Sequence, residues 1–245
     1  ACKSIISSAA IFFAFVIVVT VGQQAIGQIP NQLAQDFVAG KVPGAEDVAI
    51  YEKESAANPN DLHTTRKLGK AYFFQFFGGG DQYAVLRAKK TLERALTLGK
   101  DDPETLAYLG ALHVFAARRL YNDDAAKQKA EFDRGFELLR LAEKIDPRHG
   151  AVLAIAAGSY VALPDSYGMA PHVVEMLEGM RKGMGPYFQK FSHHGQQRLL
   201  LTLGQAYAKT GAPEKARAAF DEALKVNGSS HEADLVRSEL AKLKN

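Results

Sequence analysis

Tryptophan is absent from this chain of 245 residues, and its single cysteine is Cys2. One thiol excludes a disulfide within the chain and any zinc site built from several cysteines. The formal net charge is only +3 at pH 7, and the basic residues alternate with acidic ones. Because nucleic-acid-binding surfaces carry clustered basic side chains, this pattern argues against a nucleic-acid partner.

The motifs of common enzyme chemistry are also missing. The sequence has no Gly-x-Ser-x-Gly or His-Glu-x-x-His motif, and the glycine run at 78–80 lacks the Lys-Ser/Thr of a phosphate-binding loop. The seven histidines are scattered, and the adjacent His193 and His194 would point about 100° apart on a helix. We therefore expect no enzyme activity, no metal site and no bound cofactor.

Charge is missing altogether from residues 4–35, and residues 5–21 are nearly all apolar. A helix rises about 1.5 Å per residue, so this stretch is just long enough for a bilayer core of about 30 Å. We expect residues 1–24 to form a retained transmembrane anchor; a cleaved signal peptide is the alternative. Lys3 precedes the stretch and the next lysine is Lys41, so the positive-inside rule places the N-terminus in the cytoplasm. The expected location is a bacterial inner membrane, single-pass, with the C-terminal domain in the periplasm.

Residues 25–44 are polar and interrupted by Pro30 and Pro43, which predicts a tether with one short helix near 31–39. Cys2 would lie at the cytoplasmic face, as a free thiol or as a palmitoylation site.

The clearest pattern of the chain is Leu203-Gly204-x2-Tyr207, followed by Ala216-x3-Phe220 and Ala223. It resembles a tetratricopeptide repeat (TPR), whose signature is Leu-Gly-x2-Tyr and then Ala-x3-Phe. The resemblance implies two antiparallel helices in close contact at the glycine. Such a unit cannot bury its apolar face alone, so neighbouring units are expected.

Weaker copies of the pattern precede it, and the expected repeats lie near 62–103, 103–147, 148–190 and 197–230. A helix within 45–61 would precede them, and residues 231–245 would form a C-terminal capping helix. The expected fold is therefore all-α: a TPR-type α-solenoid of antiparallel helix pairs over 45–245, preceded by a single transmembrane helix. The resemblance assigns the packing between paired helices to these residues: Leu68, Gly69, Tyr72, Ala88, Ala95, Leu109, Gly110, Leu203, Gly204, Tyr207, Ala216, Phe220 and Ala223.

In TPR proteins the partner usually lies in a concave groove lined by the first helix of each repeat. Carried over by position, this groove would be basic at one end and apolar in the middle, which suits an acidic-aromatic segment. An equally good alternative is that Phe73 and Phe74 pack beneath the glycine loop. The expected groove residues are His63, Arg66, Lys70, Phe73, Phe74, Val114, Phe115, Arg198, Gln205 and Lys209.

A methionine stripe at 169, 176, 180 and 184 is more typical of a core or a partner-facing ridge than of copper ligands. Together these features indicate a membrane-anchored, non-catalytic scaffold. It would be an accessory or assembly subunit of an inner-membrane complex, with protein contacts on the periplasmic side. Its expected partners are other membrane-protein subunits and the lipid bilayer. The alternative is a ligand-binding accessory component of a membrane transport system.

Overall fold

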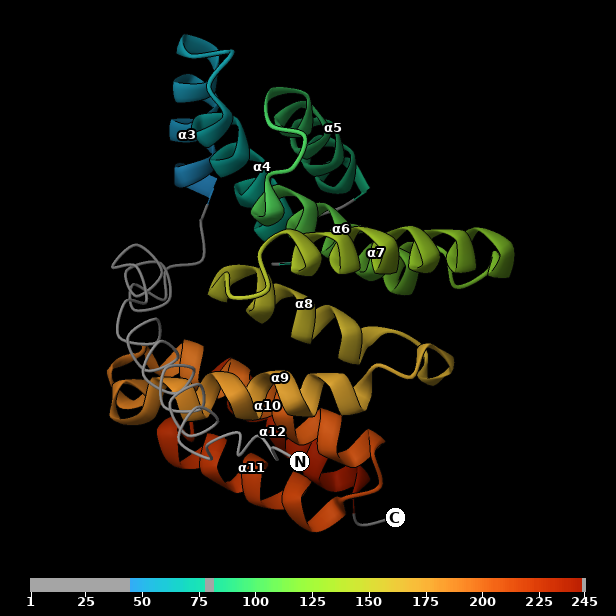
Figure 1. Ribbon diagram of the computed structural model, residues 1–245, viewed down its shortest axis with the longest axis vertical. Coiled ribbons are helices and arrows are strands. Elements are labelled where there is room, and N and C mark those ends of the chain that lie inside the picture. Colours follow the sequence, from blue (N-terminus) through green and yellow to red (C-terminus); the bar gives the residue numbers. More distant parts are fainter. Residues whose placement is uncertain (1–44, 78–81, 244–245) are drawn as a thin grey trace, which may run out of the picture.

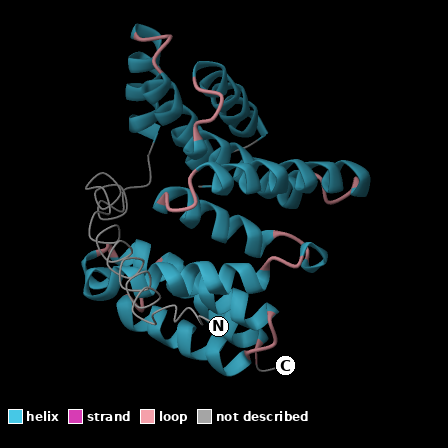
Figure 2. Ribbon diagram, viewed as in Figure 1, coloured by secondary structure: helices cyan, strands magenta, loops and turns pink. Residues whose placement is uncertain are grey.

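The computed structural model describes residues 45–77 and 82–243, in which every regular element is a helix (Figure 2). The predicted anchor at 1–24 and tether at 25–44 lie outside the described residues. Within the described part, no helix is both long enough and apolar enough to cross a membrane.

The helices form pairs that stack one on the next, from α3 at one end of the molecule to α11 and α12 at the other (Figure 1). Two short 3-10 helices, η1 and η2, flank α9. In chain order the elements are α3 (Ala45–Ala57), α4 (Leu62–Phe77), α5 (Gln82–Leu98), α6 (Pro103–Leu120), α7 (Ala125–Ile145), α8 (Gly150–Ala162), η1 (Asp165–Tyr167), α9 (Ala170–Met184), η2 (Gly185–Lys190), α10 (His193–Lys209), α11 (Pro213–Val226) and α12 (His231–Lys242).

Short polar side chains start several of these helices. The carboxylate of Asp102 accepts a hydrogen bond from the backbone N–H of Thr105 at 2.8 Å, and Pro103 occupies the first turn of α6. Ser192 and Ser230 cap α10 and α12 in the same way, at 3.1 Å and 3.0 Å. Each cap satisfies one of the N–H groups that the first turn of a helix leaves unpaired.

One contact recurs in three of the four helix pairs: a glycine of the first helix lies against a large side chain of the second. A Cβ atom added at Gly69 would lie 2.6 Å from Leu92, and one added at Gly204 would lie 2.3 Å from Phe220. At Gly110 it would lie 2.9 Å from Leu139. The same close approach in these three pairs makes this an all-helical repeat fold.

The α8–α9 pair departs from this rule. A Cβ atom at Gly158 of α8 or Gly179 of α9 would have no heavy atom within 4 Å, apart from its own helix and chain neighbours. The two helices therefore meet without the tight glycine contact, in agreement with the weak sequence pattern there.

The core consists of two clusters of buried side chains. The larger extends from α3 to α9 and includes Leu203 of α10, and the smaller joins α10, α11 and α12 around Leu200, Phe220 and Val236. Tyr207 packs against both clusters and stays half-buried, because its hydroxyl donates a hydrogen bond to Glu178 on α9. The other residues assigned to helix packing are all buried.

Candidate protein-interaction site

Helices α4 and α6 bring aromatic rings together along one side of the stack. The rings of Phe77 and Phe115 meet edge to face with centroids 4.5 Å apart, and those of Phe74 and Tyr108 are 6.0 Å apart. Phe77 remains 37% exposed, and Phe74 and Phe115 are half-buried. We call Phe74, Phe77 and Phe115 the aromatic surface. Because their neighbours hold the rings in place, they offer apolar contact area at little cost in conformational entropy.

The predicted basic end of the groove is neutralised within the chain. Arg66 lies 2.6 Å from Asp102 and 3.3 Å from Glu104, and Lys70 lies 2.6 Å from Glu104. Burial alone would raise the pKa of Asp102, but hydrogen bonds from Thr105 and the charge of Arg66 lower it below its usual value. The sequence predicted a groove that is basic at this end, but acidic residues at the N-terminus of α6 neutralise Arg66 and Lys70. Arg66 and Lys70 therefore join α4 to α6.

Two of the predicted groove residues belong to the core instead. Phe73 is 2% exposed and its ring meets that of Tyr108 at 5.2 Å, and Val114 is fully buried. Phe73 and Phe74 point about 100° apart on α4, so one of the two faces inward when the other faces outward. Val114 is buried because it lies against Gly135 of α7.

The remaining predicted residues lie apart from the aromatic surface. His63 is exposed at the start of α4, and Phe74 and Phe77 lie at the other end of that helix. On α10, Gln205 donates a hydrogen bond to Glu239 of α12 at 3.2 Å. Lys209 donates to the carbonyl oxygen of Leu163 at 3.0 Å and to Asp165 at 2.7 Å. Arg198 is exposed. Because α6 and α8 separate α4 from α10 in the stack, the predicted set is divided between two places (Figure 1).

A cavity of about 490 Å³ opens between α9, η2 and α10, where the two core clusters meet. Phe188, Leu203 and Tyr207 supply apolar lining, and Arg181 and Lys182 supply positive charge. Arg181 is paired with Glu222 at 2.5 Å. Burial and the hydrogen bond to Glu178 raise the pKa of Tyr207 to about 12, so its hydroxyl remains a donor at neutral pH. The sequence does not reveal this cavity, and the only feature predicted beside it is the weak repeat at 148–190.

Three histidines lie within ion-pair distance of single carboxylates. His113 lies 2.5 Å from Glu131, His172 lies 3.0 Å from Glu143, and His194 lies 2.9 Å from Glu232. Within residues 45–77 and 82–243, no group of three or more potential ligands could hold a metal ion. The pairs instead connect neighbouring helices.

Glu143 is the centre of a buried polar network that the sequence did not reveal. It accepts hydrogen bonds from Tyr160 of α8 at 2.7 Å and from Arg140 at 3.3 Å, in addition to its contact with His172 of α9. Burial and the contact with Glu143 raise the pKa of Tyr160 well above its usual value. This carboxylate therefore links α7 to the glycine-poor α8–α9 pair. Two of its three partners, Tyr160 and His172, are 17 and 29 residues away, beyond any local pattern.

The fold has a counterpart among solved structures. It is similar to a thermophilic TPR protein of Thermus thermophilus, with a TM-score of 0.59 and 15% sequence identity, over 90% of this chain and 98% of that one. By sequence, no family model and no curated protein matches the chain. At 15% identity the likeness concerns the fold alone, which defines the class: an all-helical repeat protein resembling a TPR solenoid. Such folds commonly serve as scaffolds for protein–protein contacts.

Proposed function

We propose that this chain is a non-catalytic scaffold that binds a protein partner through the aromatic surface of α4 and α6. The observation that carries the proposal is that Phe77 stays 37% exposed while its ring is held edge to face against Phe115. Aromatic side chains fixed in this way are enriched at protein interfaces and often dominate their binding energy.

The chemistry of the partner follows from the charges beside this surface. Arg66 and Lys70 already have carboxylate partners on and beside α6. A partner carboxylate would have to displace Asp102 or Glu104, which are more than four-fifths buried as side chains. The aromatic surface therefore suits an apolar or aromatic segment of a partner. The sequence predicted a segment that is both acidic and aromatic, and the proposal keeps only the aromatic character.

The proposal also places this scaffold at a membrane, as an accessory or assembly subunit of a bacterial inner-membrane complex. Support comes from the uncharged apolar stretch at 5–21, and the lysine distribution favours a periplasmic domain. An anchor of this kind would raise the effective concentration of the scaffold for partners in the same bilayer.

The test is recovery of a stoichiometric partner with the full-length protein in mild detergent. Phe77→Ala combined with Phe115→Ala should reduce recovery at least tenfold, because truncating one interface anchor typically costs more than about 1 kcal/mol. Tyr187→Ala on η2 is the matched control, since Tyr187 is 64% exposed and lies outside the aromatic surface. Equal recovery with the double variant and the control would contradict the proposal.

A second candidate function is that of a ligand-binding accessory component of a transport system. The cavity between α9, η2 and α10 favours it, because apolar side chains line it and Lys182 supplies a positive charge, which suits a small molecule with an apolar part and a negative charge. Native mass spectrometry of the purified chain should then show a retained molecule that is lost in Lys182→Glu.

A further inference from the structure

The outward side of α5 combines large apolar side chains with basic ones. Tyr83 and Leu86 are each 60% exposed, among the most exposed large hydrophobic side chains in the described residues. At 3.6 residues per turn, the side chains of this outward face fall within an arc of about 100°. The outer face of α5 consists of Tyr83, Leu86, Arg87, Lys90 and Arg94, all exposed. The opposite side carries the buried residues Ala84, Val85, Ala88, Leu92 and Ala95.

Positive charge is concentrated in the helix pair that includes this face. Helices α4 and α5 contain seven basic residues and one acidic residue, a net charge of +6, whereas the whole chain has +3. The rest of the chain is therefore net negative, by three charges. Helix α3, which packs against α4, accounts for this negative charge with four acidic residues and one basic residue, so α3 to α5 together carry a net charge of +3.

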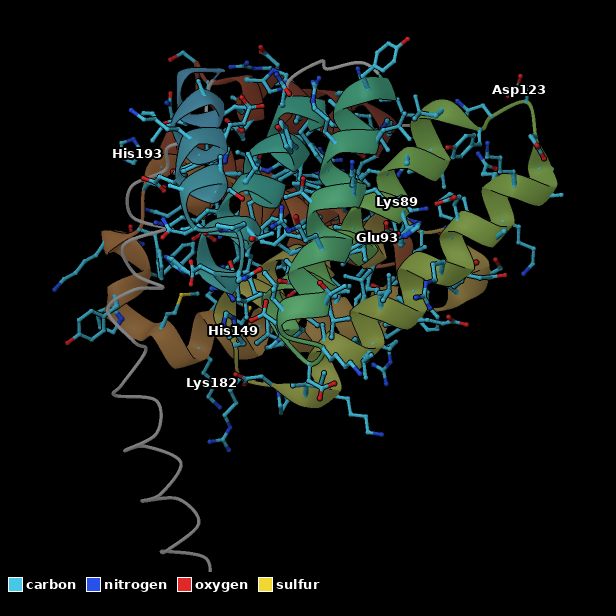
Figure 3. All side chains as sticks on the ribbon, turned by 90° about the horizontal axis from the view of Figure 1, so that it is seen from above. Lys89, Glu93, Asp123, His149, Lys182 and His193 are labelled. Atoms are coloured by element: carbon cyan, nitrogen blue, oxygen red, sulfur yellow. The ribbon has the colours of Figure 1, made fainter. Side chains whose placement is uncertain are left out.

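Among the residues that the structure describes, the cations of α5 form no ion pair, unlike Arg66 and Lys70 of α4. Arg87 donates a hydrogen bond to the Gln75 side chain at 3.1 Å, and Arg94 donates to the carbonyl oxygen of Pro59 at 2.5 Å. Across the described ranges, no carboxylate is paired with Arg87, Lys90 or Arg94. Figure 3 shows α5 with Lys89 and Glu93 labelled beside this face. These three cations face outward, next to the two exposed apolar side chains.

We propose that the outer face of α5 docks on an anionic bilayer surface. A helix on such a surface places apolar side chains at the boundary of headgroups and acyl chains, and its Arg and Lys side chains reach the phosphates. Tyrosine is enriched at this depth because its ring is apolar and its hydroxyl is polar. The outer face of α5 has all three components on one side.

The position of α5 in the chain favours a lipid over an acidic protein. The apolar stretch at 5–21 is joined to α3 by residues 22–44, which can extend over at most about 80 Å at roughly 3.5 Å per residue. Because α3 and α4 pack together and α4 pairs with α5, this end of the stack stays within reach of a bilayer that holds residues 5–21. In this respect the inference rests on the proposed membrane location.

The absence of tryptophan allows a local test in the full-length chain. Tyr83→Trp introduces a single indole, and the protein is mixed with vesicles of phosphatidylcholine alone or of phosphatidylcholine and phosphatidylglycerol in equal parts. We expect a blue shift of the emission, and quenching by brominated acyl chains, only with phosphatidylglycerol. Added salt should reverse both effects, because it screens exposed charges.

Charge reversal on α5 provides the matched comparison. In the Tyr83→Trp background, Lys90→Glu with Arg94→Glu should lose the blue shift. Lys182→Glu with Lys190→Glu, the same charge change on the exposed residues of α9 and η2, should keep it.

The outcomes separate this inference from the membrane anchor. Sedimentation with neutral vesicles but no indole shift with anionic ones would overturn docking by α5 and leave the anchor standing. An indole shift with anionic vesicles and no sedimentation with neutral ones would support docking and reject the anchor. A shift with polyglutamate and none with vesicles would also overturn the proposal, in favour of an acidic protein segment.

Discussion

Replacing Gly204 by alanine tests the contact that defines the repeat. The added Cβ would lie 2.3 Å from Cε1 and 2.6 Å from Cδ1 of Phe220, where ordinary carbon contacts are about 3.5–4.0 Å. Phe220 is fully buried in the cluster that joins α10, α11 and α12. The ring therefore has to move by more than 1 Å, roughly the overlap to be relieved, in a close-packed interior.

Two opposing effects set the magnitude. Alanine is a better helix former than glycine by about 0.8–1.0 kcal/mol, which favours the variant. Overpacking a well-packed core typically costs about 1–3 kcal/mol and occasionally more. Because the overlap involves three ring atoms and not a flexible chain end, we place the cost at the upper end. The expected net loss is about 1–2 kcal/mol, or a fall in Tm of roughly 2–8 °C for a domain of this size.

The assay is thermal and urea unfolding of the full-length protein, followed by circular dichroism, with the same substitution elsewhere as control. Gly158→Ala in α8 should stabilise by about 0.5–1 kcal/mol, because its Cβ meets no atom within 4 Å beyond its own helix. Phe220→Leu should also lessen the effect of Gly204→Ala in a double-mutant cycle. If both glycine variants shift the midpoint in the same direction and by the same amount, the close helix contact at Gly204 is refuted.

Three further predictions concern other parts of the chain. Burial, opposed by the hydrogen bond with Glu131, lowers the pKa of His113 below its ordinary 6.5, and Lys89 and Arg134 act in the same direction as burial. The stability that the neutral imidazole contributes is therefore complete above pH 6.5 and is lost as pH falls through the lower folded-state pKa. The urea midpoint should drop less on acidification in His113→Gln than in the wild type. An identical drop in the two proteins would contradict this reasoning. Glu143→Ala should lower the free energy of unfolding by about 1–3 kcal/mol, because it leaves the buried Tyr160 hydroxyl without its partner. Glu137→Ala, at an exposed residue of the same helix, should change the urea midpoint little. Finally, membranes washed with carbonate should retain the full-length chain. Protease added outside the cytoplasmic membrane should digest the chain beyond about residue 40, and protection of the C-terminal domain would reverse the proposed topology.

The sequence by itself determined the helical class and the course of the helix pairs. The spacing from Leu203-Gly204 to Ala216 and Phe220 contains both halves of one contact, because the glycine leaves space for the ring that the second helix supplies. Local signals also set the helix starts, as at Asp102-Pro103, where the carboxylate caps the turn that the proline begins. Such features lie within one helix pair or one helix turn, at fixed short spacings, so a pattern in the sequence can predict them.

Only the tertiary structure decided which residues of those helices are buried and which stay exposed. Phe73 and Phe74 are adjacent and chemically identical, and the rotation of α4 against α6 buries one and leaves the other half-exposed. The charges of Arg66 and Lys70 could be assessed only once Asp102 and Glu104, more than 30 residues later, had been brought beside them. The cavity at Arg181 is lined by α9, η2 and α10 together, so no single stretch of the sequence predicts it. Each of these outcomes depends on distances between helices, and those distances follow from the packing of the whole stack.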